Sequence, residues 1–552
     1  MLKENFSALF EESIRRHWDR PAFSDFQQES MTFGEAGKQI LAFHDFFEKS
    51  GIKQGDKVAI VGRNCSRWAV AFLSTVTYGA VAVPILADFH PDNIHHIVNH
   101  SDSRLLFVTR EIHDKIDEEK MPGLDAVFSL EDFNLLYRRD KSLHSIFKEA
   151  KEKVKGQDLQ SSDFRFSHPS DNSHLAALVY TSGTSGFSKG VMLHYNSLVA
   201  NILYANSRMR LEPGDRMLSF LPLAHSYACS FDFLFPFTVG CHITFLGKIP
   251  SPKILLEAFS SVRPRIIFFV PLIMEKLYKK RIGPLLKKPA VKVLLRLPLV
   301  SALIKNRIRR SLNEAFGGDF KEIVIGGAAL NREMEDFLKS INFPFTVGYG
   351  MTECGPLISY ASWKENPPGA VGRSIDYLEL KIASGDPIEQ AGEIMVRGEN
   401  VMLGYYKNEE ATREALDSDG WLHTGDLGLV DKNGFVYIKG RSKNLILGPS
   451  GQNIYPEEIE SRLNAMPFIQ ESVVVGEGGT VIALVYPDWE AVDAIRKQDR
   501  DGEEWLKKKM EENRLEANKT LPGHIKISRI VLQAGPFEKT PTQKIKRYLY
   551  RM

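Results

Sequence analysis

A loop rich in glycine and hydroxyl residues lies at 180–190, with the sequence YTSGTSGFSKG. Eight of its eleven residues are Gly, Ser or Thr. Glycines let backbone N–H groups approach a ligand closely, and such a nest of donors suits phosphate oxygens. The loop does not fit the Walker A pattern, GxxxxGK followed by Ser or Thr. Composition alone fits a surface loop equally well. The candidate phosphate-binding residues are Thr181, Ser182, Gly183, Thr184, Ser185, Gly186 and Lys189.

Six further segments have residue types suited to nucleotide chemistry. In chain order they are LPLAHSY (221–227), GGAAL (326–330), VGYGMTE (347–353), WLHTGDLG (421–428), GRSKN (440–444) and PTQKIKR (541–547). Together with the loop, they resemble the motifs of the adenylate-forming superfamily, in that family's order. The superfamily includes acyl-CoA ligases, peptide-synthetase adenylation domains and luciferases. The resemblance implies that a carboxylic acid is joined to AMP, with release of pyrophosphate, and is then passed to a thiol.

The resemblance assigns roles around the reacting phosphate. Lys544 matches the lysine that bridges the substrate carboxylate and the α-phosphate, which answers the need to neutralise two anions. Thr352 matches an α-phosphate contact, and Glu353 matches the acidic residue linked to Mg²⁺. Gln543 stands where the family usually has glycine, and Lys546 is the rival to Lys544 for this role.

Other positions match the walls of the nucleotide and acyl pockets. Asp426 matches the carboxylate that accepts both ribose hydroxyls, and Arg441 matches a second ribose or phosphate contact. His225 matches a histidine that lines the acyl site, although a structural hydrogen-bond partner is the common alternative for a lone histidine. The remaining pocket residues implied by the family are Gly327, Ala328, Ala329, Gly348, Tyr349, Gly350 and Met351.

The linker and one basic segment indicate which class of acid is the substrate. Lys443 matches the family's hinge, and the stretch after it is one residue longer than usual, which resembles the long-chain acyl-CoA synthetase branch. Gly451 would then lie beside a tunnel for coenzyme A. The range 276–313 has twelve Lys or Arg residues and no acid, interleaved with leucine and valine. Such a segment can lie on an anionic membrane, or it can be a solvated helical hairpin.

A folded scaffold must position these residues, and the sequence pattern predicts an α/β fold. Apolar runs such as KVAIV (57–61) and RLLFVT (104–109) alternate with helical patterns, which favours mostly parallel sheets. Residues 68–87 lack charge, but Gly79 and Pro84 indicate a buried helix and strand and not a membrane span. We expect a large AMP-binding domain at 1–440, a hinge at 441–444, and a small mobile α+β lid domain at 445–552 that carries Lys544.

Composition bounds the function classes. The net charge is +2 with a pI near 8.1, so we expect no nucleic-acid partner. The four cysteines lack metal or disulfide spacing, and the start of the chain lacks an apolar signal region. The missing signal region favours a cytoplasmic protein, and the resemblance implies a fatty acid–CoA ligase that uses ATP, Mg²⁺ and coenzyme A. Alternatives are an aryl- or succinylbenzoyl-CoA ligase, a carrier-protein ligase and an inactive lipid-binding scaffold. The sequence does not indicate the length of the acyl chain or whether the protein is a monomer or a homodimer.

Overall fold

The protein is described by a computed structural model that covers most of the chain. The described residues are 2–167, 171–181, 189–275, 298–447, 453–477, 480–496, 502–521, 525–540 and 545–550. Several predicted positions lie outside these ranges: residues 182–186 of the loop, residues 276–297 of the basic segment, Gly451 and Lys544.

The largest sheet has eight strands in the order β20-β9-β8-β4-β3-β5-β6-β7. Its five middle strands, from β8 to β6, are parallel. Parallel strands are buried on both faces, which explains their continuous apolar runs. The strands are β3 (Lys57–Val61), β4 (Val81–Ile85), β5 (Ser103–Val108), β6 (Ala126–Ser129), β7 (Leu135–Arg138), β8 (Leu175–Thr181), β9 (Lys189–His194) and β20 (Gly404–Tyr405).

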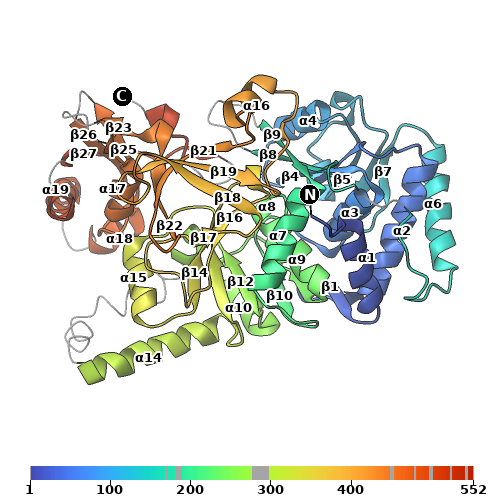
Figure 1. Ribbon diagram of the computed structural model, residues 1–552, viewed down its shortest axis with the longest axis horizontal. Coiled ribbons are helices and arrows are strands. Elements are labelled where there is room, and N and C mark those ends of the chain that lie inside the picture. The colour runs from blue at the N-terminus through green and yellow to red at the C-terminus, as the bar shows by residue number, and fades with distance from the viewer. Residues whose placement is uncertain are drawn as a thin grey trace.

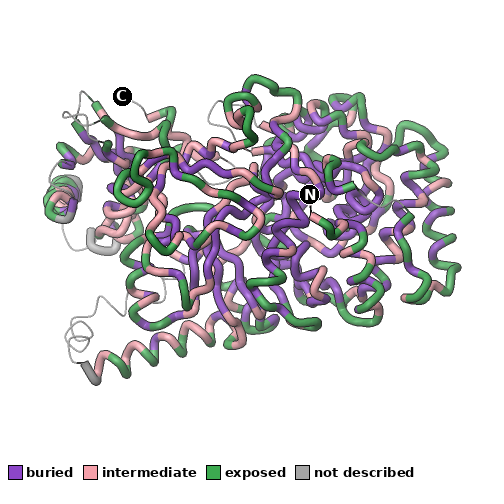
Figure 2. The backbone as a smooth tube through the Cα atoms, in the orientation of Figure 1, coloured by how far each residue is buried: buried purple, intermediate pink, exposed green. Residues whose placement is uncertain are grey.

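Helices connect and cover this sheet (Figure 1). Thr32 and Glu35 form a reciprocal capping box at the start of α2, which satisfies two backbone donors that a helix start leaves open. Figure 2 shows buried chain running through the middle of this part of the molecule, with exposed chain at its rim. The helices are α1 (Phe6–Arg16), α2 (Phe33–Lys49), α3 (Ser66–Tyr78), α4 (Pro91–His100), α5 (Arg110–His113), α6 (Ser142–Lys155) and α7 (Tyr195–Arg208).

The uncharged stretch at 68–87 forms the helix and strand that the sequence predicts. Helix α3 ends at Gly79, which has a left-handed φ of 92°, and β4 follows with every residue buried. A left-handed glycine is a common way to end a helix. Across the described residues, no helix has both the length and the apolar character to cross a membrane.

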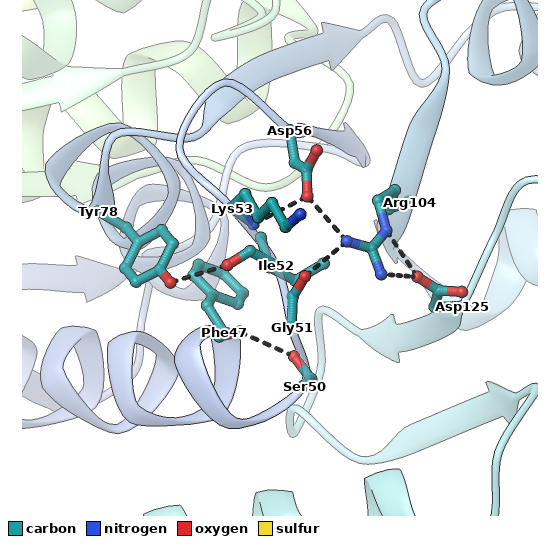
Figure 3. Close-up of polar contacts among 9 residues, drawn as sticks. All are labelled: Phe47, Ser50, Gly51, Ile52, Lys53, Asp56, Tyr78, Arg104 and Asp125. Carbon is teal, nitrogen blue, oxygen red and sulfur yellow. Dashed lines mark hydrogen bonds and ion pairs between the residues drawn. The ribbon is translucent and has the colours of Figure 1, made fainter.

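A polar network fixes the amino-terminal edge of the large sheet (Figure 3). Arg104, at the start of β5, donates to Asp56 and to the carbonyl of Gly51, each at 2.8 Å, and its Nε donates to Asp125 at 2.8 Å. The Tyr78 hydroxyl donates to the carbonyl of Ile52 at 2.8 Å. The network joins the residues after α2 to the starts of β3, β5 and β6, whereas the loop after β8 lies at the opposite, carboxyl end of the parallel strands.

A second sheet and a short parallel sheet extend the core. The second has the order β10-β11-β1-β2, and the short sheet has the order β12-β13-β14. They contain β1 (Pro21–Asp25), β2 (Ser30–Thr32), β10 (Arg216–Ser219), β11 (His242–Phe245), β12 (Ile266–Phe269), β13 (Glu322–Ile325) and β14 (Phe345–Val347). The helices of this region are α8 (Ser226–Ala228), α9 (Phe235–Val239), α10 (Pro252–Val262), α14 (Pro298–Ala315) and α15 (Arg332–Ser340).

Antiparallel strands follow, so the fold is mixed and not parallel throughout. One sheet has the order β15-β16-β17 and another has the order β18-β19-β21-β22. Their bounds are β15 (Tyr349–Gly350), β16 (Leu357–Tyr360), β17 (Arg373–Ser374), β18 (Leu378–Ala383), β19 (Gly392–Gly398), β21 (Leu422–Val430) and β22 (Val436–Arg441). Helix α16 (Glu409–Ala415) lies between β20 and β21 in the chain. A turn at 431–434, with the sequence DKNG, joins β21 to β22.

The C-terminal elements form their own hydrophobic clusters and gather at one end of the molecule (Figure 1). Pro456 is the first residue of α17, because its fixed φ and missing N–H suit a helix start. The elements are β23 (Ile446–Leu447), β24 (Asn453–Ile454), α17 (Pro456–Leu463), β25 (Ile469–Glu477), β26 (Thr480–Pro487), α18 (Trp489–Arg496), α19 (Gly502–Thr520) and β27 (Ile527–Leu532).

Candidate active site

The glycine-rich loop at 180–190 follows β8 and connects two paired strands. Thr181 is the last residue of β8 and pairs with Lys189, the first residue of antiparallel β9. Residues 182–186 lie outside the described chain. The structure thus fixes both ends of the loop at the carboxyl end of a buried strand, where open α/β sheets bind ligands.

Two glycine segments end neighbouring strands of the short parallel sheet. Gly326 donates to the carbonyl of Phe269 at 3.0 Å, and Gly348 donates to that of Ile325 at 2.9 Å. After four buried residues in β13, the segment Gly327–Ala329 is exposed, with φ of 86° at Gly327. A Cβ at Gly326 would lie 3.2 Å from the Tyr227 ring. A ligand can therefore reach the backbone at 327–329, and the Tyr227 ring packs against the preceding Gly326.

The YGMTE motif forms a tight turn whose shape requires glycine at one position. A Cβ on Gly350 would lie 2.2 Å from the carbonyl oxygen of Pro356, and Met351 donates to the same oxygen at 2.9 Å. A short 3₁₀ turn at Thr352–Cys354 follows. Thr352 and Glu353 lie in this turn, and both are half-buried.

Asp426 is the most buried acid among the predicted site residues. It is 6% exposed, it accepts a hydrogen bond from the Tyr349 hydroxyl at 2.8 Å, and it pairs with Arg441 Nε at 3.0 Å. Burial and the neighbouring carboxylate raise the pKa of Tyr349 well above its ordinary value, so the hydroxyl stays a donor. Pairing with Arg441 offsets the cost of burying this carboxylate, so Asp426 can accept hydrogen bonds from a ligand.

Glu353 has a partner that the sequence did not indicate. The Tyr405 hydroxyl donates to Glu353 Oε1 at 2.8 Å, and the Lys189 ammonium lies 4.8 Å from the centroid of the same ring. In the sequence, GYYKN shows two adjacent tyrosines and no sign of which one faces the site. Strand alternation is the one available signal, because it sends neighbours to opposite faces.

A single carboxylate of this kind fits a Mg²⁺ site. Magnesium is usually held by one or two carboxylates together with substrate phosphates. Glu353 Oε2 has no hydrogen-bond partner within the described chain. Over the same residues, no group of three or more His, Cys, Asp or Glu side chains is arranged to hold a metal ion by itself.

Two predicted residues lie at the margins of this constellation. His225 is half-buried and immediately precedes α8 (Ser226–Ala228), on the same segment as Tyr227. Lys443 is exposed in a 3₁₀ turn at Ser442–Asn444, directly after β22. Next to it, Asn444 donates to Glu457 of α17 at 2.6 Å, which connects the linker to the C-terminal elements.

Comparison with known proteins identifies relatives over most of the chain. Residues 10–406 match the family model of AMP-binding enzymes. The long-chain-fatty-acid–CoA ligase FadD15 of Mycobacterium bovis is 31% identical, over 85% of this chain and 79% of the relative. The peroxisomal long chain acyl-CoA synthetase 7 of Arabidopsis thaliana is 29% identical, over 84% and 70%.

Solved structures share the fold at lower identity. ATP-bound MatB from Rhodopseudomonas palustris has a TM-score of 0.76 and 22% identity, over 99% of this chain and 98% of that one. The anthranilate CoA ligase AuaEII, in complex with anthranoyl-AMP, has a TM-score of 0.77 and 20% identity, over 100% and 97%. These similarities confirm the expected α/β architecture with its separate C-terminal unit.

Proposed function

The chain belongs to the AMP-binding enzyme family, and from this premise we propose that it is a fatty acid–CoA ligase. In the first half-reaction a fatty acid carboxylate attacks the α-phosphorus of ATP, and acyl-AMP and pyrophosphate form. In the second, the thiol of coenzyme A attacks the acyl carbon, AMP leaves, and the thiol proton is released. The observation that supports nucleotide binding here most directly is the pairing of Asp426 with Tyr349 and Arg441. Tyr349 belongs to the same motif as Thr352 and Glu353.

Each side chain then has a role in binding or orientation. Asp426 accepts the ribose hydroxyls, held in place by Tyr349 and Arg441. Thr352 contacts the α-phosphate, and Glu353 would hold Mg²⁺, whose charge offsets that of the phosphates. Lys189 and the loop at 181–189 bind the β- and γ-phosphates, which leave as pyrophosphate.

The pocket walls and the linker complete the proposal. Gly327, Ala328 and Ala329 lie against the adenine, because small exposed residues after a strand leave room for a flat ring. His225 lines the acyl side. Lys544 enters from the C-terminal unit for the first half-reaction, and rotation about Lys443 then opens the path for coenzyme A beside Gly451.

The relatives support fatty acids as the substrate class. One of the two relatives is named for long-chain fatty acids and the other for long-chain acyl-CoA synthesis, whereas the aryl-acid ligases among the solved structures share the fold alone. We therefore infer medium to long acyl chains.

Helix α14 supports contact with an anionic membrane, where such acids partition. Leu303 is 71% exposed and shares an outward face with exposed Arg307 and Arg310. Ile308, on the opposite face, is buried. A basic face with an exposed apolar side chain is typical of a membrane-surface helix. The helix also projects from the body of the molecule (Figure 1).

The test is pyrophosphate release by the purified protein with ATP, Mg²⁺ and coenzyme A across a panel of acids. We expect release to rise from acetate to palmitate and to stay low with benzoate and succinylbenzoate. A maximum with an aromatic acid would contradict the fatty acid assignment while keeping the chemistry. No release with any acid, despite ATP binding, would contradict the ligase itself.

A further inference from the structure

Tyr405 contacts two oppositely charged side chains of the candidate site at once. Its hydroxyl donates to Glu353 Oε1 at 2.8 Å, and its ring carries the Lys189 ammonium at 4.8 Å from the centroid. A carboxylate accepts from a phenol O–H, and a cation is attracted to the face of the ring. One phenol therefore serves both charges through different parts of its structure.

The backbone holds Tyr405 firmly between the two motifs. Strand β20 pairs with β9, so that Tyr405 lies opposite Val191, two residues after Lys189. Met402, shortly before, donates to the carbonyl of Glu353 at 2.8 Å, and the Tyr405 N–H donates to Thr412 Oγ1 at 2.9 Å. The segment 402–406 thus bridges the end of the phosphate loop and the turn that presents Glu353.

Neither charge is neutralised by the other. Within the described chain, Lys189 and Glu353 have no ion-pair partner, although both contact one ring. Direct pairing would neutralise the cation that should meet phosphate and the carboxylate that should meet a divalent metal.

We propose that Tyr405 is a positioning residue that orients Glu353 for Mg²⁺ and Lys189 for the ATP phosphates while keeping the two from pairing. The inference rests on the proposed function, in which Glu353 holds the metal. It assigns separate tasks to the two parts of the side chain. The hydroxyl governs the dependence of ATP binding on Mg²⁺, and the ring governs the affinity for ATP phosphates irrespective of metal.

Two substitutions separate these tasks. Tyr405→Phe keeps the ring and removes the hydroxyl, and Tyr405→Leu removes both. The neighbouring Tyr406 offers a matched control, because its hydroxyl donates to Asp102 at 2.8 Å and Lys407 lies 5.2 Å from its ring centroid. Tyr406→Phe therefore deletes the same kind of contact outside the site.

The experiment is calorimetric titration of ATP into each purified protein, at a series of Mg²⁺ concentrations and in EDTA. For Tyr405→Phe we expect the Mg²⁺ concentration that gives half of the gain in ATP affinity to rise about tenfold, the size of one hydrogen bond to a charged group. Its ATP affinity in EDTA should stay as in the parent protein. Tyr405→Leu should also lose about two- to fivefold affinity in EDTA.

Two results would overturn the inference. In the first, Tyr405→Phe has the same Mg²⁺ dependence of ATP binding as Tyr406→Phe. In the second, Tyr405→Phe loses as much ATP affinity without Mg²⁺ as with it, as a general structural defect would cause. Glu353→Gln separates this failure from that of the proposed function. If Glu353→Gln raises the Mg²⁺ requirement and Tyr405→Phe does not, the role of Tyr405 alone is wrong. If neither variant alters it, Glu353 does not hold the metal and both assignments fall.

Discussion

Asp426 shows how burial and pairing prepare one carboxylate for a ligand. Its two oxygens contact Tyr349 and Arg441, so the side chain is held in one orientation. The HTGDLG motif predicts Asp426, but not its partner Tyr349, 77 residues away in the chain. Tyr405 was missed for a related reason. A single sequence shows which residues are present, and only the folded chain shows which strand face points toward Glu353.

Replacing Asp426 with asparagine should weaken ATP binding while keeping the fold, because the amide has nearly the same size but no charge. We expect the KM for ATP to rise roughly 10- to 100-fold, the cost of losing charged hydrogen bonds to a ligand. Steady-state kinetics with varied ATP provide the measurement. Asp431→Asn, in the turn of the same hairpin, is the control, and an equal effect there would contradict the ribose role.

At the scale of elements, the regular strands were predictable and the short turns were not. KVAIV (57–61) became β3 without change, because a continuous apolar run in a parallel sheet has few alternatives. The turn at Thr352–Cys354 depends on Gly350 packing against Pro356, a contact that no local pattern shows. In the basic segment, α14 at Pro298–Ala315 is a helix, whereas residues 276–297 lie outside the described chain.

Neutralising the outward face of α14 should weaken binding to anionic membranes. Each basic side chain near such a surface contributes about 1 kcal/mol, so the double variant Arg307→Gln with Arg310→Gln should bind about 10- to 30-fold less tightly. Flotation with vesicles containing phosphatidylglycerol measures this. Lys151→Gln with Lys155→Gln, on the exposed side of α6, is the matched control.

The membrane assignment for α14 fails if both pairs reduce vesicle binding equally, or if the parent protein binds neutral phosphatidylcholine vesicles just as well. Added salt should also weaken binding by the parent protein, because salt screens charges at an exposed surface.

At the scale of the whole molecule, the motifs predicted the family, because they recur in that family's order along the chain. The alternation of apolar runs with helical patterns predicted the α/β architecture. The domain boundaries remain predictions. One contact within the C-terminal unit bears on them: Arg547 pairs with Glu460, which also accepts from the Val474 N–H at 2.6 Å. Arg547 lies three residues after Lys544, so this pair anchors the end of the chain on α17 and β25.

The anchor should make the first half-reaction depend on pH. Burial raises the pKa of Glu460 to about 7, although Arg547 opposes the rise; the like charge of Glu457 and the Val474 N–H also face this carboxyl. Glu460 is therefore ionised above pH 7 and becomes neutral as pH falls, which weakens its pairing with Arg547. Pyrophosphate release that requires the fatty acid substrate should drop several-fold as pH falls through about 7.

Glu460→Gln should show low pyrophosphate release at every pH, without this step. Thioester formation from preformed acyl-AMP is the internal control and should be spared, as it should be in Lys544→Ala. A wild-type profile that is flat from pH 6 to 8 would contradict the anchor, and equal loss of both half-reactions in Lys544→Ala would contradict the role of that lysine.

The hairpin of β21 and β22 has a consequence for how this site tolerates insertions. Asp426 and Arg441 are cross-strand partners, and the turn at 431–434 sets which residues meet. Because side chains alternate along a strand, a slip of one residue would turn Asp426 to the opposite face. An added or deleted residue in that exposed turn would therefore damage nucleotide binding as surely as a substitution in the pocket. During evolution, this turn should accept substitutions more readily than insertions or deletions.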